Sequence, residues 1–285
     1  MANRHFGKLA DVWKHLPLVE VLAIERPSAY WESHAGSPIY EVPTNDAERE
    51  YGAVRYFATA AGEPRLDAAR YTRHLRDLNP AGSLTRYPGS AALAMFERGR
   101  DASYVVCDTD SGSAHELRDI AAALDVNATV AERDGMSVLH DQLASTPDPH
   151  VVLAHVDPYD PWATGPAGLS ATDLAGELAT AGVRVVYWYG YDRPDERAWA
   201  FDALAERYPG ALWCGDVIVG DTRVSDGDLG DATSAGTGFG VALANVSAAS
   251  VQACAQLGEA LARVYAGATL PDGSPGSIDF ATMAR

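Results

Sequence analysis

Short apolar runs alternate along this chain with stretches in which apolar residues recur at helical spacing. Most of the runs end in a small or acidic residue before a helical stretch begins. This order predicts a mostly parallel sheet covered by helices, because parallel neighbours need a crossover connection between them. The predicted strands cover residues 29–33, 103–108, 129–132, 151–156, 183–189, 211–219 and 240–245.

Signals for helix boundaries stand between these runs. Ser113-Ala114-His115-Glu116 has the form of a capping box, and Gly182 follows a helical repeat at the position of a C-cap. Pro194 is expected to open another helix, because proline is favoured in the first helical turn. The last strong helical pattern covers residues 248–265.

Roughly fifty residues separate the first predicted strand from Tyr87, far more than an ordinary strand-to-helix loop contains. Leu66, Ala69 and Leu75 fall at helical spacing within this stretch, so we expect a small helical insertion over residues 41–86. The main domain then consists of residues 1–40 and 87–285. Residues 220–238 are expected to form an exposed loop, and the tail after Gly267 to be loosely ordered.

The charge of the chain limits its partners. Lys and Arg number 22 and Asp and Glu number 39, so that the net charge is −17. Nucleic-acid binding depends on Lys and Arg, and such a chain has no global attraction to phosphate. Arginines gather between residues 49 and 100; we favour a solvated helical face there, with a local basic patch as the alternative.

The cysteines and the hydropathy of the chain predict the cellular environment of the protein. Cys107, Cys214 and Cys254 are widely spaced in apolar surroundings, which favours reduced core thiols over a disulfide or zinc framework, and no metal site is suggested. No run of eighteen apolar residues occurs, and the first residues lack the layout of a signal peptide. We therefore expect a cytoplasmic protein with no membrane partner.

Three acidic or glycine-containing turns are candidates for ligand binding. In Glu32-Ser33-His34-Ala35-Gly36 a strand ends in an acid, and Gly36 would let a ligand approach the backbone, although an ordinary turn has the same composition. Asp108 ends the next strand, where an acid commonly accepts hydrogen bonds from ribose hydroxyls; it is equally well placed to cap a helix. Asp134-Gly135 suits either an adenine amine or a simple turn.

Asp157 is the strongest single candidate for function. It follows the predicted strand at residues 151–156 and begins the stretch Asp157-Pro158-Tyr159-Asp160-Pro161-Trp162. A carboxylate at the carboxyl end of such a strand faces the crevice in which open α/β sheets bind their ligands. Tyr159 or Trp162 could stack on a flat substrate beside it.

In this order, the elements resemble one family over nearly the whole chain: the bacterial methyltransferases that modify adenine N6 in large-subunit ribosomal RNA. The resemblance implies a Rossmann-like class I methyltransferase fold with a mostly parallel seven-stranded sheet, S-adenosylmethionine as cofactor, and ribosomal RNA as partner. The landmarks are residues 5–15, Ser33-His34-Ala35-Gly36, Tyr87-Pro88-Gly89-Ser90, Asp108, Asp134-Gly135, Asp157-Pro158, Tyr187-Trp188-Tyr189 and residues 237–245.

The resemblance also assigns roles to matching positions. Asp157 and Pro158, with Tyr159, would hold the target amine, whose lone pair is freed when a carboxylate and a backbone carbonyl accept its hydrogens. The candidate cofactor-binding residues are Lys14, His15, His34, Gly36, Ser90, Asp108 and Asp134. Some have structural alternatives, since His15 could pack the first helix, His34 could order its turn and Ser90 could cap a helix.

The sequence departs from the family pattern in both loops. Pro38 stands where the family has a second glycine, so that this turn has neither a positive φ nor an N–H there. Tyr159-Asp160 replaces the family's Pro-Tyr, which places an acid near the acceptor. Three hypotheses follow: a methyltransferase acting on ribosomal RNA, one acting on a small flat or amine-bearing molecule, and a non-catalytic fold that has lost the cofactor.

Overall fold

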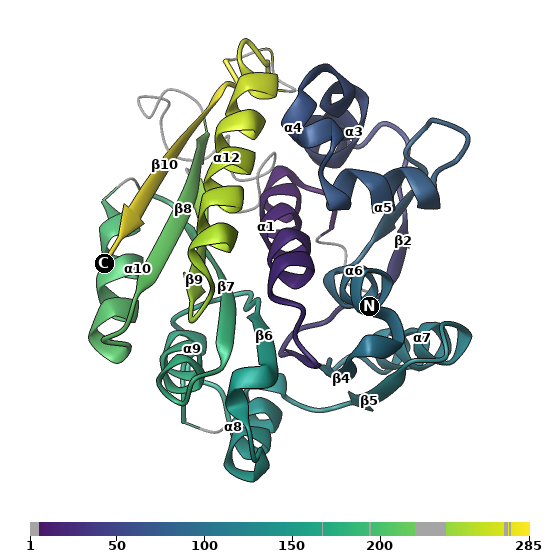
Figure 1. The fold of residues 1–285 in the computed structure, drawn as a ribbon. Coiled ribbons are helices and arrows are strands. Elements are labelled where there is room, and N and C mark those ends of the chain that lie inside the picture. Colours follow the sequence, from purple (N-terminus) through teal and green to yellow (C-terminus); the bar gives the residue numbers. More distant parts are fainter. Residues whose placement is uncertain (1–5, 167, 194, 220–237, 271–272, 274) are drawn as a thin grey trace.

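The computed structural model describes residues 6–166, 168–193, 195–219, 238–270, 273 and 275–285, and its centre is an eight-stranded sheet (Figure 1). The strand order is β10-β8-β9-β7-β6-β1-β4-β5. The strands are β1 (Ala29–Glu32), β4 (Ser103–Cys107), β5 (Asn127–Ala131), β6 (Val152–Val156), β7 (Arg184–Tyr191), β8 (Leu212–Val219), β9 (Gly238–Ala244) and β10 (Ile278–Ala284). A separate antiparallel pair consists of β2 (Ile39–Glu41) and β3 (Arg86–Pro88).

The predicted α/β fold is confirmed, and each of the seven predicted strands has its counterpart in the sheet. Strands β5, β4, β1, β6 and β7 are parallel to one another, whereas β9 is antiparallel to both β7 and β8. β1 lies between β4 and β6 in the sheet. After β1 the chain therefore builds one side of the sheet with β4 and β5, and then crosses to the other side with β6 and β7. Such a switch in strand order opens a crevice at the carboxyl ends of these strands.

The C-terminal tail differs from the prediction of a loosely ordered segment. Residues 278–284 form β10, which pairs antiparallel with β8 along its whole length. Phe280 anchors this strand: its ring lies edge-on to Trp13 at 5.1 Å and packs over Gly258, where a Cβ atom would come within 2.2 Å of the ring. One partly buried ring and one glycine therefore order a segment that shows no clear periodicity.

Helices cover both faces of the sheet. The α-helices are α1 (Leu9–Glu25), α2 (Ala47–Arg49), α3 (Arg55–Thr59), α4 (Pro64–Asp67), α5 (Arg70–Leu78), α6 (Ser90–Arg98), α7 (Ser111–Ala123), α8 (Gly135–Ser145), α9 (Ala171–Thr180), α10 (Glu196–Arg207) and α12 (Ala248–Tyr265). Shorter π or 3-10 segments are η1 (Glu50–Val54), η2 (Ala60–Gly62), η3 (Gly99–Asp101) and η4 (Pro149–Val151). None of the described helices is both long and apolar enough to span a membrane.

The core consists of two clusters, one on each face of the sheet. Leu153 in β6 belongs to the cluster that contains residues of α1, α6 and α12, while its neighbours Val152 and Ala154 belong to the cluster that contains residues of α8, α9 and α10. Successive side chains of a strand point to opposite faces, so the alternation along β6 separates the two clusters. Cys107, Cys214 and Cys254 are buried free thiols within this core.

Residues 41–86 contain several short helices between β2 and β3. The single helical stretch predicted around Leu66 and Leu75 is divided, because α4 ends at Asp67 and α5 begins at Arg70. Tyr51, Leu66 and Leu75 belong to the same buried cluster as α1 and α12. The helices of this segment therefore complete the core on that face of the sheet (Figure 1).

The other predicted helix boundaries have different outcomes in the structure. Helix α7 begins at Ser111, two residues before the predicted capping box, because the Asp110 side chain caps it by accepting from the Ser113 N–H at 2.9 Å. The predicted C-cap is confirmed, since Gly182 has a φ of 96° after α9. Pro194, most of the loop predicted at residues 220–238, and the N-terminal end of the landmark at residues 5–15 lie outside the described residues.

Candidate active site

A groove of about 1400 Å³ opens where β6 and β7 end, between α1 and α10. Binding pockets for one small molecule commonly have about 300 to 1000 Å³, so the groove has room for a cofactor and an acceptor together. Six sequence candidates line it: Lys14, His34, Asp108, Asp157, Pro158 and Tyr159.

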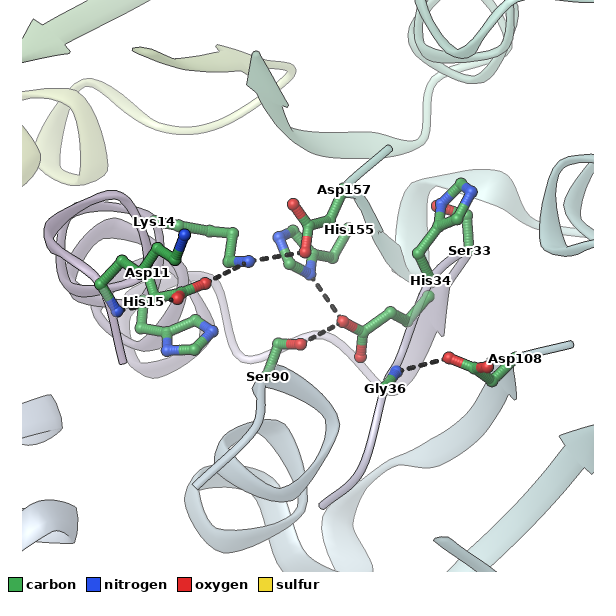
Figure 2. Close-up of polar contacts among 12 residues, drawn as sticks. Asp11, Lys14, His15, Ser33, His34, Gly36, Ser90, Asp108, His155 and Asp157 are labelled. Atoms are coloured by element: carbon green, nitrogen blue, oxygen red, sulfur yellow. Dashed lines mark hydrogen bonds and ion pairs between the residues drawn. The ribbon is translucent and has the colours of Figure 1, made fainter. Parts of the chain in front are cut away.

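Lys14 holds Asp157 at the floor of this groove (Figure 2). The Lys14 Nζ atom lies 2.7 Å from Asp157 Oδ2 and 2.9 Å from Asp11 Oδ1, and all three side chains are largely buried. Burial lowers the pKa of Lys14, but the two carboxylates outweigh it and raise the pKa above its ordinary value. Lys14 is therefore a fixed cation, and within the described residues Asp157 Oδ1 accepts no hydrogen bond.

The two residues after Asp157 differ in exposure. Pro158 is buried, while Tyr159 is 88% exposed. Asp160 accepts from the backbone N–H groups of Trp162 and Ala163 at 2.9 and 3.2 Å. The acid in this loop thus shapes a turn that presents Tyr159 and Trp162 beside Asp157.

The turn after β1 meets the end of β4 through Asp108. Gly36 has a φ of 61° and donates its N–H to Asp108 Oδ2 at 2.8 Å (Figure 2). Asp110 donates its N–H to Asp108 Oδ1 at 2.8 Å. Asp108 is not the helix cap, because Asp110 has that role. A carboxylate has about four acceptor positions, so two remain for a ligand in the groove.

His34 follows in the same turn and lines the groove. Its Nδ1 atom lies 2.8 Å from Ser33 Oγ, so the ring does order its turn, the alternative considered from the sequence. Burial lowers the pKa of His34, and this outweighs the nearby carboxylates of Asp157, Asp134 and Asp108. The ring is therefore neutral at pH 7 and has both a donor and an acceptor nitrogen.

Pro38 occupies a place in this loop where its backbone restriction is harmless. Its carbonyl accepts from the Gly89 N–H at 2.8 Å, and β2 begins at the next residue. The left-handed conformation of the turn falls on Gly36 instead. A Cβ atom at Gly89 would lie 2.4 Å from the Ser37 carbonyl oxygen, so the loop and residues 87–90 are in close contact.

Comparison with known proteins decides the family. The model of the family described as ribosomal RNA large subunit methyltransferase D, RlmJ, matches residues 25–189, more than half of the chain. The chain belongs to this family. The matched range contains His34, Ser90, Asp108, Asp134 and Asp157.

A solved structure with the same fold covers nearly the whole of this RlmJ-family chain. A Legionella pneumophila protein of the family DUF519 is 20% identical, with a TM-score of 0.73 over 98% of each chain. An S-adenosylmethionine-dependent methyltransferase from Agrobacterium tumefaciens is 12% identical, with a TM-score of 0.42 over 86% of this chain and 65% of its own. Among curated proteins, none matches the chain in sequence. The predicted class I methyltransferase fold is confirmed.

The cofactor of this RlmJ-family chain is S-adenosylmethionine. The residues of the groove fit that molecule. An acid at the end of the second parallel strand, with two unused acceptor positions, suits a pair of ribose hydroxyls. Asp108 meets this requirement beside the tight turn at Gly36. Neutral His34 faces the same space and could bind either a donor or an acceptor of the cofactor.

The remaining cofactor candidates lie outside the lining of the groove. His15 is buried in α1, where its Nδ1 atom lies 2.9 Å from the Tyr87 hydroxyl. The Ser90 hydroxyl donates to Glu32, and Asp134 caps α8 by accepting from the Ser137 N–H at 2.8 Å. In this structure these three side chains have structural partners, and a direct contact with the cofactor remains a proposal for each.

Two polar residues beneath the groove were not selected from the sequence. Glu32 Oε1 lies 2.9 Å from His155 Nδ1, and Glu32 Oε2 accepts from the Tyr30 hydroxyl at 2.9 Å. Both Glu32 and His155 are 0% exposed. The available signal was a histidine two residues before Asp157 in an otherwise apolar strand, where it shares the face of Asp157.

Proposed function

We propose that this chain transfers the methyl group of S-adenosylmethionine to an amino nitrogen of a planar acceptor. The observation that carries the proposal is the position of Asp157: Lys14 fixes one carboxylate oxygen at 2.7 Å, and Asp157 lines the same groove as His34 and Asp108. Asp108 and His34, with Gly36, would position the cofactor. Asp157, Pro158 and Tyr159 would position the acceptor.

The chemistry requires alignment and an available lone pair. When bound, S-adenosylmethionine supplies a methyl carbon activated by its sulfonium. Asp157 Oδ1 would accept one amine hydrogen and the Pro158 carbonyl the other, which turns the nitrogen lone pair toward that carbon. Transfer would form the N–C bond and break the C–S bond of the cofactor, which would leave as a sulfide, and the proton lost by the amine would pass to solvent past Asp157 Oδ1. Tyr159 would hold the plane of the ring by stacking.

The charge of the groove favours a small molecule as the acceptor. Every basic side chain in its lining is paired with an acid: Lys8 with Glu48, Lys14 with Asp157, and Arg49 with Asp46 at 2.9 Å. RNA binding needs cations that replace the counterions of phosphate, and a paired cation gains little from a phosphate.

Several arginines between residues 49 and 100 are also paired with acids or buried, and these gain little from binding an RNA phosphate. Arg70 pairs with Glu97 at 2.8 Å and Arg76 with Asp67 at 2.7 Å, while Arg49 is buried. Five of the nine arginines in this stretch form an ion pair, so acids neutralise part of the local basic patch considered from the sequence. These contacts support an acceptor without phosphates.

An adenine N6 of ribosomal RNA is the second candidate, and the family match favours it. It would make the chain an RNA-binding enzyme of ribosomal RNA processing in the cytoplasm. Asp157 and Pro158 fit this acceptor as well, because the reacting group is again a planar amine. The two candidates differ in what surrounds the amine and not in the chemistry.

A labelling experiment separates the candidates. The protein is incubated at low salt with methyl-labelled S-adenosylmethionine and with unmodified large-subunit ribosomal RNA, adenine or 4-aminoquinoline in parallel reactions, and products are identified by mass spectrometry. Label on the nitrogen of a free amine supports the proposal, and label on RNA alone supports the second candidate. Asp157→Asn serves as the control that should lose transfer in either case.

A further inference from the structure

Exposed aromatic rings gather at one end of the groove. Among the described residues, four large apolar side chains are exposed: Tyr159, Trp162, Trp199 and Val151. The first three line the groove, with Trp162 49% exposed and Trp199 55% exposed. Isolated exposed apolar residues are common, but three rings in a single groove indicate a binding surface.

These rings come from separate elements that meet at the carboxyl edge of the sheet. Tyr159 and Trp162 follow β6, Trp188 and Tyr191 belong to β7, and Trp199 lies on α10. We name these five side chains the aromatic end of the groove. Because Asp157 also follows β6, a flat molecule stacked here would have its edge near the carboxylate that we propose to hold the reacting amine.

Acidic side chains accompany the rings. Asp157, Asp160, Asp192 and Glu196 line the aromatic end, whereas the basic residues of the lining belong to α1, its N-cap and α2. The faces of two rings already attract cations of the chain itself: the Arg193 guanidinium lies 5.6 Å from the centre of Trp199, and Lys14 Nζ lies 5.9 Å from that of Trp188. The surroundings thus combine π faces with carboxylates, of which Asp157 already pairs with Lys14 at 2.7 Å and Glu196 with Arg193 at 3.6 Å.

We propose that the aromatic end binds the methyl acceptor as a planar cation, a heteroaromatic ring whose ring nitrogen is protonated or quaternary and whose separate amino nitrogen is neutral and takes the methyl group. This inference rests on the proposed function, since it names the class of acceptor for the same site. A cation gains both from the ring faces and from the carboxylates, whereas a neutral ring gains only from stacking. An anionic ring, or a base carried on phosphate, is opposed by the same carboxylates.

Binding of three bicyclic probes of similar shape tests the charge preference without any methyl transfer. At pH 7.5 and low salt, 1-methylquinolinium is a cation, quinoline is neutral and 2-naphthoate is an anion. Calorimetric titration should give a dissociation constant about tenfold lower for the cation than for quinoline, and no measurable binding of the anion. Equal or tighter binding of quinoline or 2-naphthoate overturns the proposal.

Variants locate the probe site. Trp199→Ala should weaken all probe binding, and Asp160→Asn combined with Glu196→Gln should remove the advantage of the cation while quinoline still binds. Asp202→Asn is the matched control, because it removes one exposed acid of α10 outside the groove lining. If Asp202→Asn reduces cation binding as much as the groove variants do, the preference reflects net charge alone and the proposal fails.

The outcome is distinguishable from failure of the proposed function. Probe binding does not need S-adenosylmethionine, and the labelling experiment with adenine does not need a cationic acceptor. Loss of the cation preference with retained amine methylation would contradict only this inference. Thermal unfolding of each variant, with a midpoint close to that of the unaltered chain, confirms that it is folded.

Discussion

His155 Nδ1 lies 2.9 Å from Glu32 Oε1, and neither side chain has any exposed surface. Glu32 ends β1 and also accepts from the hydroxyls of Tyr30 and Ser90, while His155 precedes Asp157 by two residues in β6. The carboxylate therefore joins the ends of β1 and β6 to the start of α6. The turn at Gly36, proposed to bind the cofactor, follows β1, and Asp157, proposed to position the methyl acceptor, follows β6.

Removing the histidine should destabilise the fold strongly. His155→Leu leaves Glu32 buried with one partner fewer, and breaking a buried pair costs about 3 to 5 kcal/mol. Urea unfolding measures the change in the free energy of unfolding. His115→Leu is the matched control, because His115 is 75% exposed and should change stability by less than about 0.5 kcal/mol. Similar losses in the two variants would show that the buried pair has no special role.

Neutralising Asp157, which we propose to position the methyl acceptor, should lower the rate of methyl transfer without weakening cofactor binding. Asp157→Asn should lower the rate of methyl transfer by about 10² to 10⁴-fold, the usual range for loss of a positioned acid–base group, with little change in the dissociation constant of S-adenosylmethionine. Asp160→Asn, in the same loop, should have a far smaller effect on the transfer rate with adenine. Substantial transfer by Asp157→Asn would remove Asp157 from its role.

The loop containing Pro38 should depend on Gly36 for its conformation. Pro38→Gly restores the family residue but adds conformational freedom to the unfolded chain, so it should destabilise by about 0.4 to 1 kcal/mol and leave cofactor affinity nearly unchanged. Gly36→Ala forces a side chain to a φ of 61° and should cost about 1 to 3 kcal/mol and weaken the cofactor. A large gain in cofactor affinity in Pro38→Gly would mean that proline had impaired the site.

Stability should fall as the solution becomes mildly acidic. Burial lowers the pKa of His15 well below its usual 6.5, so below about pH 6.5 the unfolded state binds a proton that the folded state does not. The stability from this group is present above that pH and is lost as the pH falls, by up to about 1.4 kcal/mol per pH unit.

The contribution of His15 can be isolated by a difference. Unfolding in urea between pH 5 and 8 should give a shallower pH dependence for His15→Gln, which keeps a polar partner for the Tyr87 hydroxyl. His34 continues to titrate in both proteins, so the dependence should not vanish. Parallel curves for the two proteins would exclude His15 as a source of the acid sensitivity.

The sequence predicted the strands and the crevice well, because apolar runs followed by helical patterns leave few arrangements of a parallel sheet. Asp108 and Asp157 were found for the same reason, since each directly follows a strand. Glu32 was noted only as the acid that ends a strand, and His155 was missed, because their contact joins residues 123 positions apart. Strand β10 depends on Phe280 meeting Gly258, and no local pattern contains that contact.

Other site residues show the limit of single motifs. Asp134 and Ser90 occupy positions that match the family landmarks, yet one caps α8 and the other donates to Glu32. His34 orders its turn and lines the groove as well. A local motif predicts where a polar side chain lies, but its partner is set by the packing of distant elements.

The most direct test of the account is a calorimetric titration of the protein with S-adenosylmethionine, repeated with Asp108→Asn. We expect one binding site in the unaltered chain and affinity at least about tenfold weaker in the variant, since the charged acceptor of the ribose hydroxyls is lost. The amide oxygen of asparagine can still accept a backbone N–H. An unchanged thermal midpoint would show that the variant is folded. No heat at millimolar cofactor, or equal affinity in the two proteins, would contradict the assignment of this groove.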